Sequence, residues 1–332
     1  MSAPVKVAVA GAGAWGRNHL RVLHGLGALA GAVEVCEASR ERVRQDFPGL
    51  PVWGSLAEAF RHGGALDGVV IATPAPTHAD LAGEALREGR GVLVEKPMTL
   101  EAREAAGLVD QAEGAGRVLM VGHLLLYQPA VRELKRLLDS GILGRVHRIH
   151  QERTNLGRVR STESALWSLA PHDVAVLVHL MGEAPVRVSA DGAAFLQPGV
   201  HDDVHLELGF TGGRSAHVHV SWYWPGRGRG LRVLGERGML VYDEEDQSLV
   251  LHRKRLHGGD CPRRLETVDD GSVRVFEGPG EALRLEDEHF LHCLATGATP
   301  TSDGRSGLDV IRVLERADAQ LLGALPPSLK EA

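Results

Sequence analysis

Cysteine is scarce in this chain, and its spacing excludes two kinds of site. The 332 residues contain only Cys36, Cys261 and Cys293, which lie far apart in the sequence. An odd and widely spaced set indicates neither a disulfide framework nor a CxxC metal site, and it fits a reducing compartment. We therefore expect a cytoplasmic protein.

The chain also lacks long apolar runs, a signal peptide and an excess of basic residues. No segment approaches the ~18 consecutive apolar residues of a membrane span. The first residues lead directly into a strand pattern, without the basic and apolar segments of a signal peptide. The formal net charge is -6, which gives no electrostatic support for a nucleic-acid surface. We expect neither a membrane nor a nucleic acid as a partner.

The first third of the chain alternates short apolar runs with helical patterns. Strands are predicted at 5–10, 32–36, 68–73, 91–95 and 118–121, and helices follow several of them, at about 77–88 and 99–113. The run at 68–73 is almost purely apolar, as in a strand buried on both faces. This alternation predicts an N-terminal Rossmann domain over residues 1–122, built on a doubly wound parallel sheet.

The pattern changes in residues 123–332. Helices are predicted at 129–138, 171–180, 281–295 and 306–322. Between about 186 and 252 apolar and polar residues alternate with period two, which indicates antiparallel strands. Residues 253–280 predict a loop or an edge hairpin. The second domain is therefore expected to be α+β, with a large, mostly antiparallel open sheet.

A glycine-rich turn joins the first predicted strand to a helix. Gly11, Gly13 and Gly16 have the spacing that permits a tight turn, close approach of a pyrophosphate and close strand–helix packing. Ala14 and Trp15 complete this predicted dinucleotide site, where the N-terminus of the helix supplies free N–H groups.

An acidic residue is expected about 20 residues after the last glycine, where it binds the ribose 2′-hydroxyl. Glu37 follows the predicted strand 32–36 at about this distance. Its negative charge favours NAD over NADP, although Arg40 is positioned to tolerate a ribose phosphate.

Lys96 follows the predicted buried strand 91–95, in the sequence Glu95-Lys96-Pro97. Ligands of open α/β sheets bind at the carboxyl ends of the strands. A lysine at this edge is able to stabilise the alkoxide that forms as hydride leaves an alcohol. The alternative is an ordinary surface lysine.

The combination of motifs resembles the glucose–fructose oxidoreductase/inositol dehydrogenase/rhizopine-catabolism (Gfo/Idh/MocA) family over nearly the whole chain. The resemblance is carried by the glycine turn, Thr73-Pro74 with His78, Glu95-Lys96-Pro97, Pro171-His172-Asp173 and Thr301-Ser-Asp-Gly304. It implies that Lys96 is the catalytic lysine and His172 its histidine partner. It also implies cofactor contacts from Thr73, Pro74, His78, Glu95 and Lys96.

The predicted histidine site has one departure from the family pattern. Pro171 suggests that His172 lies in the first turn of a helix, where the dipole would keep the imidazole neutral and able to accept a proton. Many family members carry an aspartate four residues before this histidine, but here the position is Ser168. Proton removal would then fall to His172 and Lys96.

The second half resembles family members that oxidise C3 of UDP-linked N-acetylamino sugars. Arginines bind phosphate well, amides bind sugar hydroxyls, and aromatic rings stack on sugar faces. On this basis the substrate-binding residues are predicted to be Lys96, Tyr127, Gln128, Arg153, Asn155, Arg158, Arg160, Trp167 and His172. Each has an ordinary alternative as a solvated arginine or a core aromatic residue.

Three other functions remain open at this point. A free sugar or cyclitol dehydrogenase would use the same fold and Lys96. Some relatives cleave glycosides through transient C3 oxidation, and others of the same fold are non-catalytic NAD-binding regulators. The histidines at 205–210 and 217–222 are interpreted as sheet residues, and no metal site is predicted. The resemblance implies a homodimer or homotetramer assembled through the open sheet.

Overall fold

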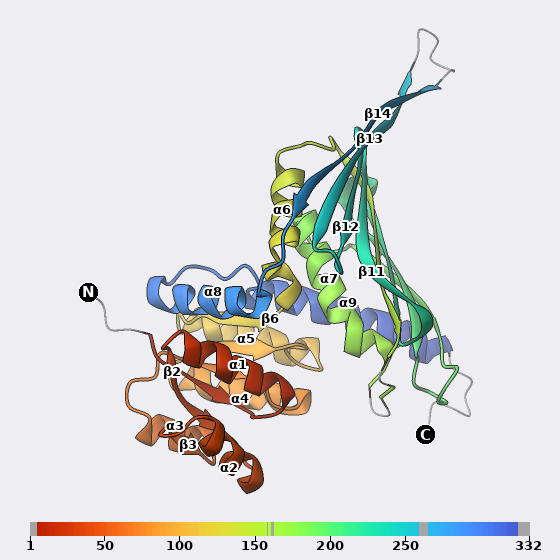
Figure 1. Cartoon of the computed structure of the whole chain (residues 1–332). Helices are drawn as coiled ribbons and strands as arrows, with labels where there is room; N and C mark the ends of the chain where they lie inside the picture. The colour runs from red at the N-terminus through yellow and green to blue at the C-terminus, as the bar shows by residue number, and fades with distance from the viewer. Residues whose placement is uncertain (1–4, 158, 161–162, 259–264, 325–332) are drawn as a thin grey trace. The chain divides into compact units, whose positions relative to one another are not determined.

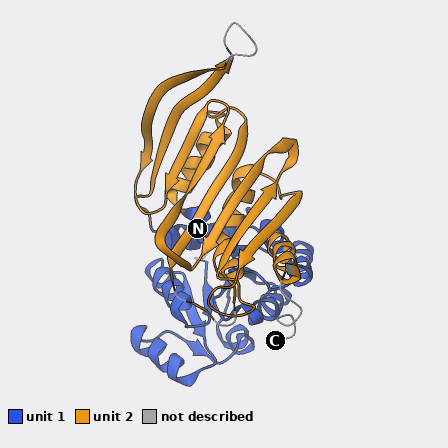
Figure 2. Cartoon of the chain, turned by 90° about the vertical axis from the view of Figure 1, so that its right-hand side faces the viewer, with its two compact units in different colours: residues 1–127, 281–311 blue, residues 128–280, 312–332 orange. Residues whose placement is uncertain are grey.

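The chain forms two compact units. The computed structural model describes residues 5–157, 159–160, 163–258 and 265–324. Unit 1 comprises residues 1–127 and 281–311, and unit 2 comprises residues 128–280 and 312–332 (Figure 2). The expected single division after residue 122 is therefore incomplete, because residues 281–311 belong with the N-terminal unit.

Unit 1 is built on a parallel sheet whose strand order is β3-β2-β1-β4-β5-β6 over the described residues. The strands are β1 (Val7–Ala10), β2 (Leu29–Val33), β3 (Val52–Trp53), β4 (Gly68–Ile71), β5 (Gly91–Glu95) and β6 (Leu119–Gly122). The strand order reverses between β1 and β4, and this switch point is where open α/β sheets bind ligands. The predicted doubly wound sheet is confirmed, but β2 ends at Val33 rather than at Cys36.

Helices connect the parallel strands of unit 1, and one further helix comes from residues 281–311 (Figure 1). They are α1 (Ala14–Gly25), α2 (Glu37–Asp46), α3 (Leu56–His62), α4 (His78–Arg87), α5 (Ala102–Gly114) and α8 (Ala282–Thr296), with the short turns η1 (Ala75–Thr77) and η2 (Leu124–Tyr127). Ser55 caps α3 by accepting the Glu58 N–H at 3.2 Å. The cap of α5 is Glu101, whose carbonyl accepts the Thr99 hydroxyl at 2.7 Å.

Unit 2 is built on a larger sheet with the order β14-β13-β12-β11-β7-β10-β9-β8 over the described residues. The strands are β7 (Val146–Leu156), β8 (Arg187–Ala193), β9 (Asp203–Gly209), β10 (Ser215–Ser221), β11 (Tyr223–Gly235), β12 (Gly238–Asp243), β13 (Ser248–Gly258) and β14 (Leu265–Glu277). Neighbours pair antiparallel except β7 and β10, which are parallel. The mostly antiparallel sheet is confirmed, and β13 with β14 form the edge hairpin that was one of two expectations for 253–280.

Helices cover one face of the unit 2 sheet. They are α6 (Pro129–Asp139) and α7 (Ala165–Met181), and the last helix, α9 (Gly304–Ala324), contributes its second half to this unit. Along β10, Ala216, Val218 and Val220 are buried, while His217 and His219 alternate with them and point to the opposite face. The period-two pattern in the sequence therefore separates a core face from a polar face.

Candidate functional site

The turn between β1 and α1 has the features of a phosphate-binding loop. Gly11 has φ +94°, and a Cβ there would lie 2.6 Å from the Ala72 carbonyl oxygen. A Cβ on Gly16 would lie 1.8 Å from the Gly11 carbonyl oxygen, whereas one on Gly13 would meet nothing within 4 Å. Gly11 and Gly16 therefore allow close packing, and Gly13 leaves open space. The first turn of α1 has no acidic residue and no side-chain cap, so its N–H groups suit a pyrophosphate.

The acidic residue that directly follows β2 is Glu34, not Glu37. The Ala12 N–H of the glycine loop donates to Glu34 Oε2 at 2.8 Å, and the Cys36 N–H donates to Oε1 at 2.9 Å. Glu37 is instead the first residue of α2 and is exposed; its carboxylate pairs with Arg40 and with Arg44. Those two arginines lower the pKa of Glu37. The predicted position of Glu37 at the end of a strand is wrong because β2 ends three residues earlier than expected.

Arg40 does not present a free positive charge to a ribose phosphate. Its Nε donates to Glu37 at 2.8 Å, and Nη1 donates to the Glu34 carbonyl at 2.9 Å. The guanidinium is thus tied to its own helix and to the end of β2. This arrangement weakens the expectation that Arg40 accommodates NADP.

Lys96 lies at the carboxyl edge of the unit 1 sheet. It directly follows β5, which pairs with β4, and β4 pairs with β1 before the glycine loop. Thr73 and Pro74 follow β4 at the same edge. His78 faces the Pro97 carbonyl through Nδ1 at 2.8 Å and the Thr73 carbonyl through Nε2 at 2.9 Å. Because both ring nitrogens face backbone carbonyls, His78 fixes the loops after β4 and β5 rather than offering a polar atom to the cofactor.

A buried group of ionisable side chains lies beside Lys96 in unit 1. His19 Nε2 is 3.1 Å from Glu95 Oε1, and His19 Nδ1 is 2.8 Å from Asp287 Oδ1. Burial lowers the pKa of His19, but these two carboxylates outweigh it and raise the pKa well above 6.5. Burial raises the pKa of Glu95, but His19 and Lys96 outweigh it and lower the pKa. The ion pair with His19 keeps Glu95 in its carboxylate form next to the Lys96 ammonium.

Two further groups in this region are buried without hydrogen-bond partners among the described residues. They are both oxygens of Glu286 and both ring nitrogens of His123. Burial, followed by the charge of Glu95, raises the pKa of Glu286 well above 4.5. Burial and the charge of Lys96 lower the pKa of His123 to about 4, although Glu95 opposes this shift. His123 is therefore neutral near pH 7, and burial favours the protonated form of Glu286.

Tyr127 is a core residue rather than a sugar-stacking one. Its side chain is fully buried, and its hydroxyl lies 2.9 Å from Ser302 Oγ and 3.8 Å from the Met120 sulfur. Burial raises the pKa of its phenol. The prediction that Tyr127 contacts the substrate is wrong, because its ring is packed into the core of unit 1.

The predicted histidine site lies in α7 of unit 2, but not in a first turn. The helix starts at Ala165, and Pro171 lies inside it. His172 is therefore a mid-helix residue, and the argument that a helix N-terminus keeps its imidazole neutral does not hold. Ser168 is buried one turn before His172 on the same helix, as the spacing predicted.

Arg153 is not a free phosphate-binding residue. It lies in β7 rather than in a loop, and it is 4% exposed. Its Nε donates to both Asp173 oxygens at 2.8 and 2.9 Å, and Nη1 and Nη2 donate to Glu244 at 3.2 and 2.9 Å. Burial lowers the pKa of Arg153, but Asp173 and Glu244 outweigh this and raise it. Arg229, 3.5 Å from Glu244, balances the second carboxylate.

The other residues predicted to bind substrate have mixed outcomes. The exposed Arg160 pairs with Glu163 at 2.6 Å, and Arg158 lies outside the described residues. Gln128 accepts a hydrogen bond from the Tyr242 hydroxyl. Trp167 is half-buried and is hydrogen-bonded to Asp318. Asn155 is half-buried near the end of β7. Among the described residues at these positions, unit 2 thus offers amides but not a cluster of free arginines.

Two family models match this chain in succession. "Oxidoreductase family, NAD-binding Rossmann fold" matches residues 5–123, and "GFO/IDH/MocA C-terminal domain" matches residues 131–241. The chain belongs to the Gfo/Idh/MocA family. The resemblance inferred from the motifs is confirmed, and the protein is an oxidoreductase of this family with an NAD-binding fold.

The relatives of this Gfo/Idh/MocA protein include dehydrogenases named for different substrates. It is 24% identical to scyllo-inositol 2-dehydrogenase (NAD(+)) of Bacillus subtilis, over 90% of this chain and 89% of that one. It is 27% identical to UDP-N-acetylglucosamine 3-dehydrogenase of Acidithiobacillus ferrooxidans, over 92% and 94%. The solved structure of the latter superposes with TM-score 0.84 at 24% identity, covering 96% and 98% of the two chains. An oxidoreductase structure from Magnetospirillum magnetotacticum is 31% identical, with TM-score 0.80 over 94% and 99%.

NAD is the cofactor of this family protein, and the loop geometry of unit 1 fits it. Gly13 leaves room for a pyrophosphate, the N-terminus of α1 is uncapped, and Glu34 follows β2. No helix within the described residues is long and apolar enough to cross a membrane.

Sequence reasoning missed Glu34, His19, His123, Glu286 and Asp287. Glu34 lies 18 residues after Gly16, close to the spacing expected for the ribose-binding acid. The predicted strand 32–36 included Glu34, so Glu37 was taken as the first acidic residue after the strand. His19 lies one turn after Gly16 on α1, where its spacing alone looks like an ordinary helical residue. Asp287 comes from α8, about 270 residues away in the sequence. Only the tertiary structure brings these groups together.

Proposed function

We propose that this protein oxidises a secondary hydroxyl of a sugar or cyclitol to a ketone, with NAD as the hydride acceptor. The observation that carries the proposal is Lys96 at the carboxyl end of β5, beside the buried Glu95–His19–Asp287 chain. The characterised relatives, which oxidise inositol and a UDP-amino sugar, support a polyol substrate.

Lys96 stabilises the charge that develops on the substrate oxygen. As the carbinol C–H bond breaks and its hydride leaves, the oxygen acquires alkoxide character. An ammonium group next to that oxygen favours this state more than the ground state. Glu95, whose pKa is lowered by His19 and Lys96, favours the charged form of the lysine. NAD, when bound, supplies the hydride acceptor.

We assign His172 as the acceptor of the hydroxyl proton. A neutral imidazole is suited to this role near pH 7. The hydroxyl proton goes to His172, the hydride goes to NAD, and the ketone is released. Ser168 carries no charge, so it does not replace the aspartate that many family members have at this position.

Glu34 is the residue we propose to bind the adenosine ribose. It follows β2 directly and already accepts the Ala12 N–H of the phosphate loop with one oxygen. A carboxylate there repels a 2′-phosphate and accepts from a free hydroxyl. This assignment replaces Glu37 and supports the preference for NAD.

A UDP-linked N-acetylamino sugar oxidised at C3 is the second candidate substrate. The relative that oxidises such a sugar matches most of both chains. Against it, Arg153 has its charge balanced by Asp173 and Glu244, so it does not provide the surplus positive charge a diphosphate needs. The geometry therefore favours a free polyol.

The test is NADH formation by the purified chain, followed at 340 nm. The substrates are myo- and scyllo-inositol, free N-acetylglucosamine, UDP-N-acetylglucosamine and its glucuronate, each with NAD and with NADP. Turnover of inositol or a free sugar supports the first candidate, and turnover of a UDP-sugar alone supports the second. NAD binding with no turnover, also with a 2-oxo acid as hydride acceptor, would contradict the proposal in favour of a non-catalytic NAD-binding protein.

Two variants test the assigned residues. Lys96→Met and His172→Asn are each expected to lower kcat by about 10²–10⁴-fold, with circular dichroism and thermal unfolding unchanged. Only His172→Asn is expected to change the shape of the pH–rate profile, which should lose the limb that reports the base. Near wild-type kcat in either variant would remove that residue from the mechanism.

A further inference from the structure

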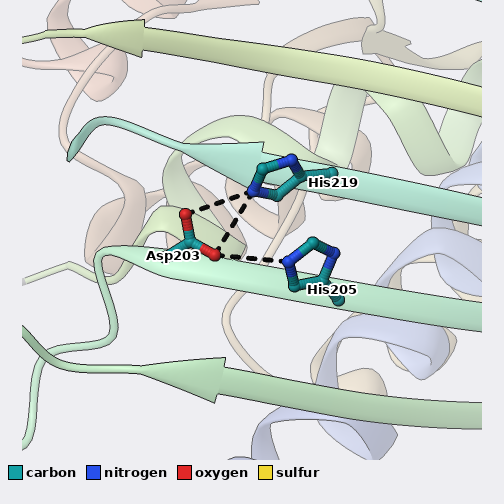
Figure 3. A group of neighbouring side chains, drawn as sticks. All are labelled: Asp203, His205 and His219. Carbon is teal, nitrogen blue, oxygen red and sulfur yellow. Dashed lines mark hydrogen bonds and ion pairs between the residues drawn. The ribbon is translucent and has the colours of Figure 1, made fainter. Parts of the chain in front are cut away.

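The polar face of the unit 2 sheet carries a group of histidines and one carboxylate that the proposed reaction does not use. His205 lies on β9 and His219 is its cross-strand neighbour on β10. Asp203 lies two residues before His205, so its side chain points to the same face. Figure 3 shows the Asp203 carboxylate beside the two neighbouring rings, where it contacts one nitrogen of each.

The distances between these donor atoms match those of a metal centre. His219 Nε2 is 3.1 Å from Asp203 Oδ2, and His205 Nε2 is 3.4 Å from Oδ1. Zinc bonds of about 2.0–2.2 Å in tetrahedral geometry place neighbouring ligand atoms about 3.3 Å apart. One ligand atom from each of the three residues lies within 4.8 Å of the other two. The donor atoms that are furthest apart must therefore move closer together when one ion binds all three residues.

The surroundings fix the donors in place. Asp203 is 9% exposed and His219 is 8% exposed, and the rings of His205 and His219 stack with centroids 4.1 Å apart. His217 continues the stack at 5.5 Å from His205, followed by His150 at 4.9 Å. Strands hold the donor atoms more rigidly than a loop would, so little order has to be gained on binding.

We propose that Asp203, His205 and His219 bind one divalent transition-metal ion of the zinc type. Two imidazole nitrogens and one carboxylate oxygen suit Zn²⁺, and also Ni²⁺ or Cu²⁺, rather than Mg²⁺ or Ca²⁺. Three protein ligands leave a further coordination position open. The ion links β9 to β10, so it acts on the stability of the sheet and is independent of hydride transfer in the proposed function.

Zinc titration of the full chain, freed of metal by a chelator, tests the site. Calorimetry is expected to show one Zn²⁺ bound per chain, and thermal unfolding to move to higher temperature with Zn²⁺. His205→Gln and His219→Gln are expected to weaken binding by roughly 100-fold or more, beyond what loss of an indirect partner costs. His205→Gln is expected to disturb the fold less than His219→Gln, because the His205 side chain is 43% exposed.

His252→Gln is the matched control. His252 is an exposed histidine on β13 of the same sheet, hydrogen-bonded to Ser272 at 2.7 Å, and the variant is expected to bind Zn²⁺ like the wild type. Equal affinity in all four proteins, or no stoichiometric binding by the wild type, would overturn the proposal. Turnover measured alongside separates this outcome from failure of the proposed function.

A second readout locates the ion without relying on histidine variants. Trp224 lies edge-on to the His219 ring at 5.2 Å, so bound Cu²⁺ is expected to quench its fluorescence. Trp224→Phe should remove most of the quenching while one equivalent of Cu²⁺ still binds. Quenching that is unchanged in Trp224→Phe would place the ion elsewhere and overturn the assignment.

Discussion

Both units bury ionisable side chains, but one cluster in each unit balances its charges differently. In unit 2, Arg153 and Arg229 carry two positive charges against the two negative charges of Asp173 and Glu244. In unit 1, Glu95 and Asp287 both contact the single histidine His19, the oxygens of Glu286 have no hydrogen-bond partner among the described residues, and the Lys96 charge lies beside Glu95. A balanced cluster is typical of a scaffold, whereas an unbalanced cluster, in which acidic groups outnumber the cations, is typical of a functional site.

Residue type alone gave a wrong prediction for Arg153. Arginine is the usual residue for a diphosphate, and Arg153 was therefore predicted to bind one. Its burial and its two carboxylate partners show that it belongs to the framework of the sheet. Lys96, by contrast, lies beside the unbalanced cluster of unit 1, where its charge lowers the pKa of Glu95.

The largest expected effect is on the balanced cluster. Arg153→Met leaves Asp173 buried without its cation, whereas Glu244 keeps Arg229. Loss of the buried cation costs about 3–5 kcal/mol of unfolding free energy. Denaturant unfolding measures this loss. The control is Arg148→Met on the same strand, where an exposed pair with Glu207 is worth only about 0–1 kcal/mol. Similar losses in both variants would mean that the buried cluster is not a structural unit.

The next effect separates packing from ligand contact within unit 1. Gly16→Ala forces a Cβ to 1.8 Å from the Gly11 carbonyl oxygen, so the backbone must move, at a cost of about 1–3 kcal/mol. Gly13→Ala meets no neighbour within 4 Å and has an ordinary φ of -68°. It should fold normally and bind NAD more weakly. Unfolding free energy and NAD titration distinguish the two, and normal NAD affinity in Gly13→Ala would refute its proposed contact.

The fold was predictable to a large extent because its signals are local. Apolar runs, the glycine turn and period-two alternation depend on neighbouring residues, and they gave the parallel sheet, the open sheet and the turn before α1. The predicted ends of helices and strands were wrong where tertiary contacts determine them. The start of α7 precedes Pro171 by six residues, so this proline lies inside the helix and does not mark its first turn.

The candidate site was predictable only in its strand-end residues. Lys96 and the glycines are fixed by the elements on either side of them. The partners of His19 and Arg153 come from distant segments, such as α8 for Asp287 and the turn after β12 for Glu244, and no spacing rule brings these together. Tyr127 and Arg153 are examples. Their residue types suggested that they bind a ligand, but both side chains are buried and contact other residues of the protein.

Glu286 provides a pH-dependent test of the unbalanced cluster. Because burial raises its folded-state pKa above the ordinary value of 4.5, its contribution to stability is present below pH 4.5 and is lost as the pH rises toward the folded-state pKa. His19, with a raised pKa, adds a loss of the same sign above pH 6.5. In Glu286→Gln the fall in unfolding free energy above pH 4.5 should be shallower, by up to about 1.4 kcal/mol per pH unit.

Denaturant unfolding across pH 5–8 measures this slope. The control is Glu281→Gln, whose side chain is half exposed and pairs with Arg21 at the surface. It should follow the wild-type slope. If Glu286→Gln also follows it, the carboxyl of Glu286 does not hold the extra proton, and the cluster of unit 1 is less unbalanced than its contacts indicate.

The smallest expected effect concerns Arg160, the one described arginine of the predicted 158–160 phosphate pair. Its exposed ion pair with Glu163 is worth about 0–1 kcal/mol, so Arg160→Gln should change KM for the best substrate by less than about twofold. Steady-state kinetics with inositol and with UDP-N-acetylglucosamine measure this. A KM that rises for the UDP-sugar alone would mean that Arg160 leaves Glu163 to bind the diphosphate. The positive charge that unit 2 lacks for a nucleotide sugar would then come from its surface, and the second candidate function would replace the first.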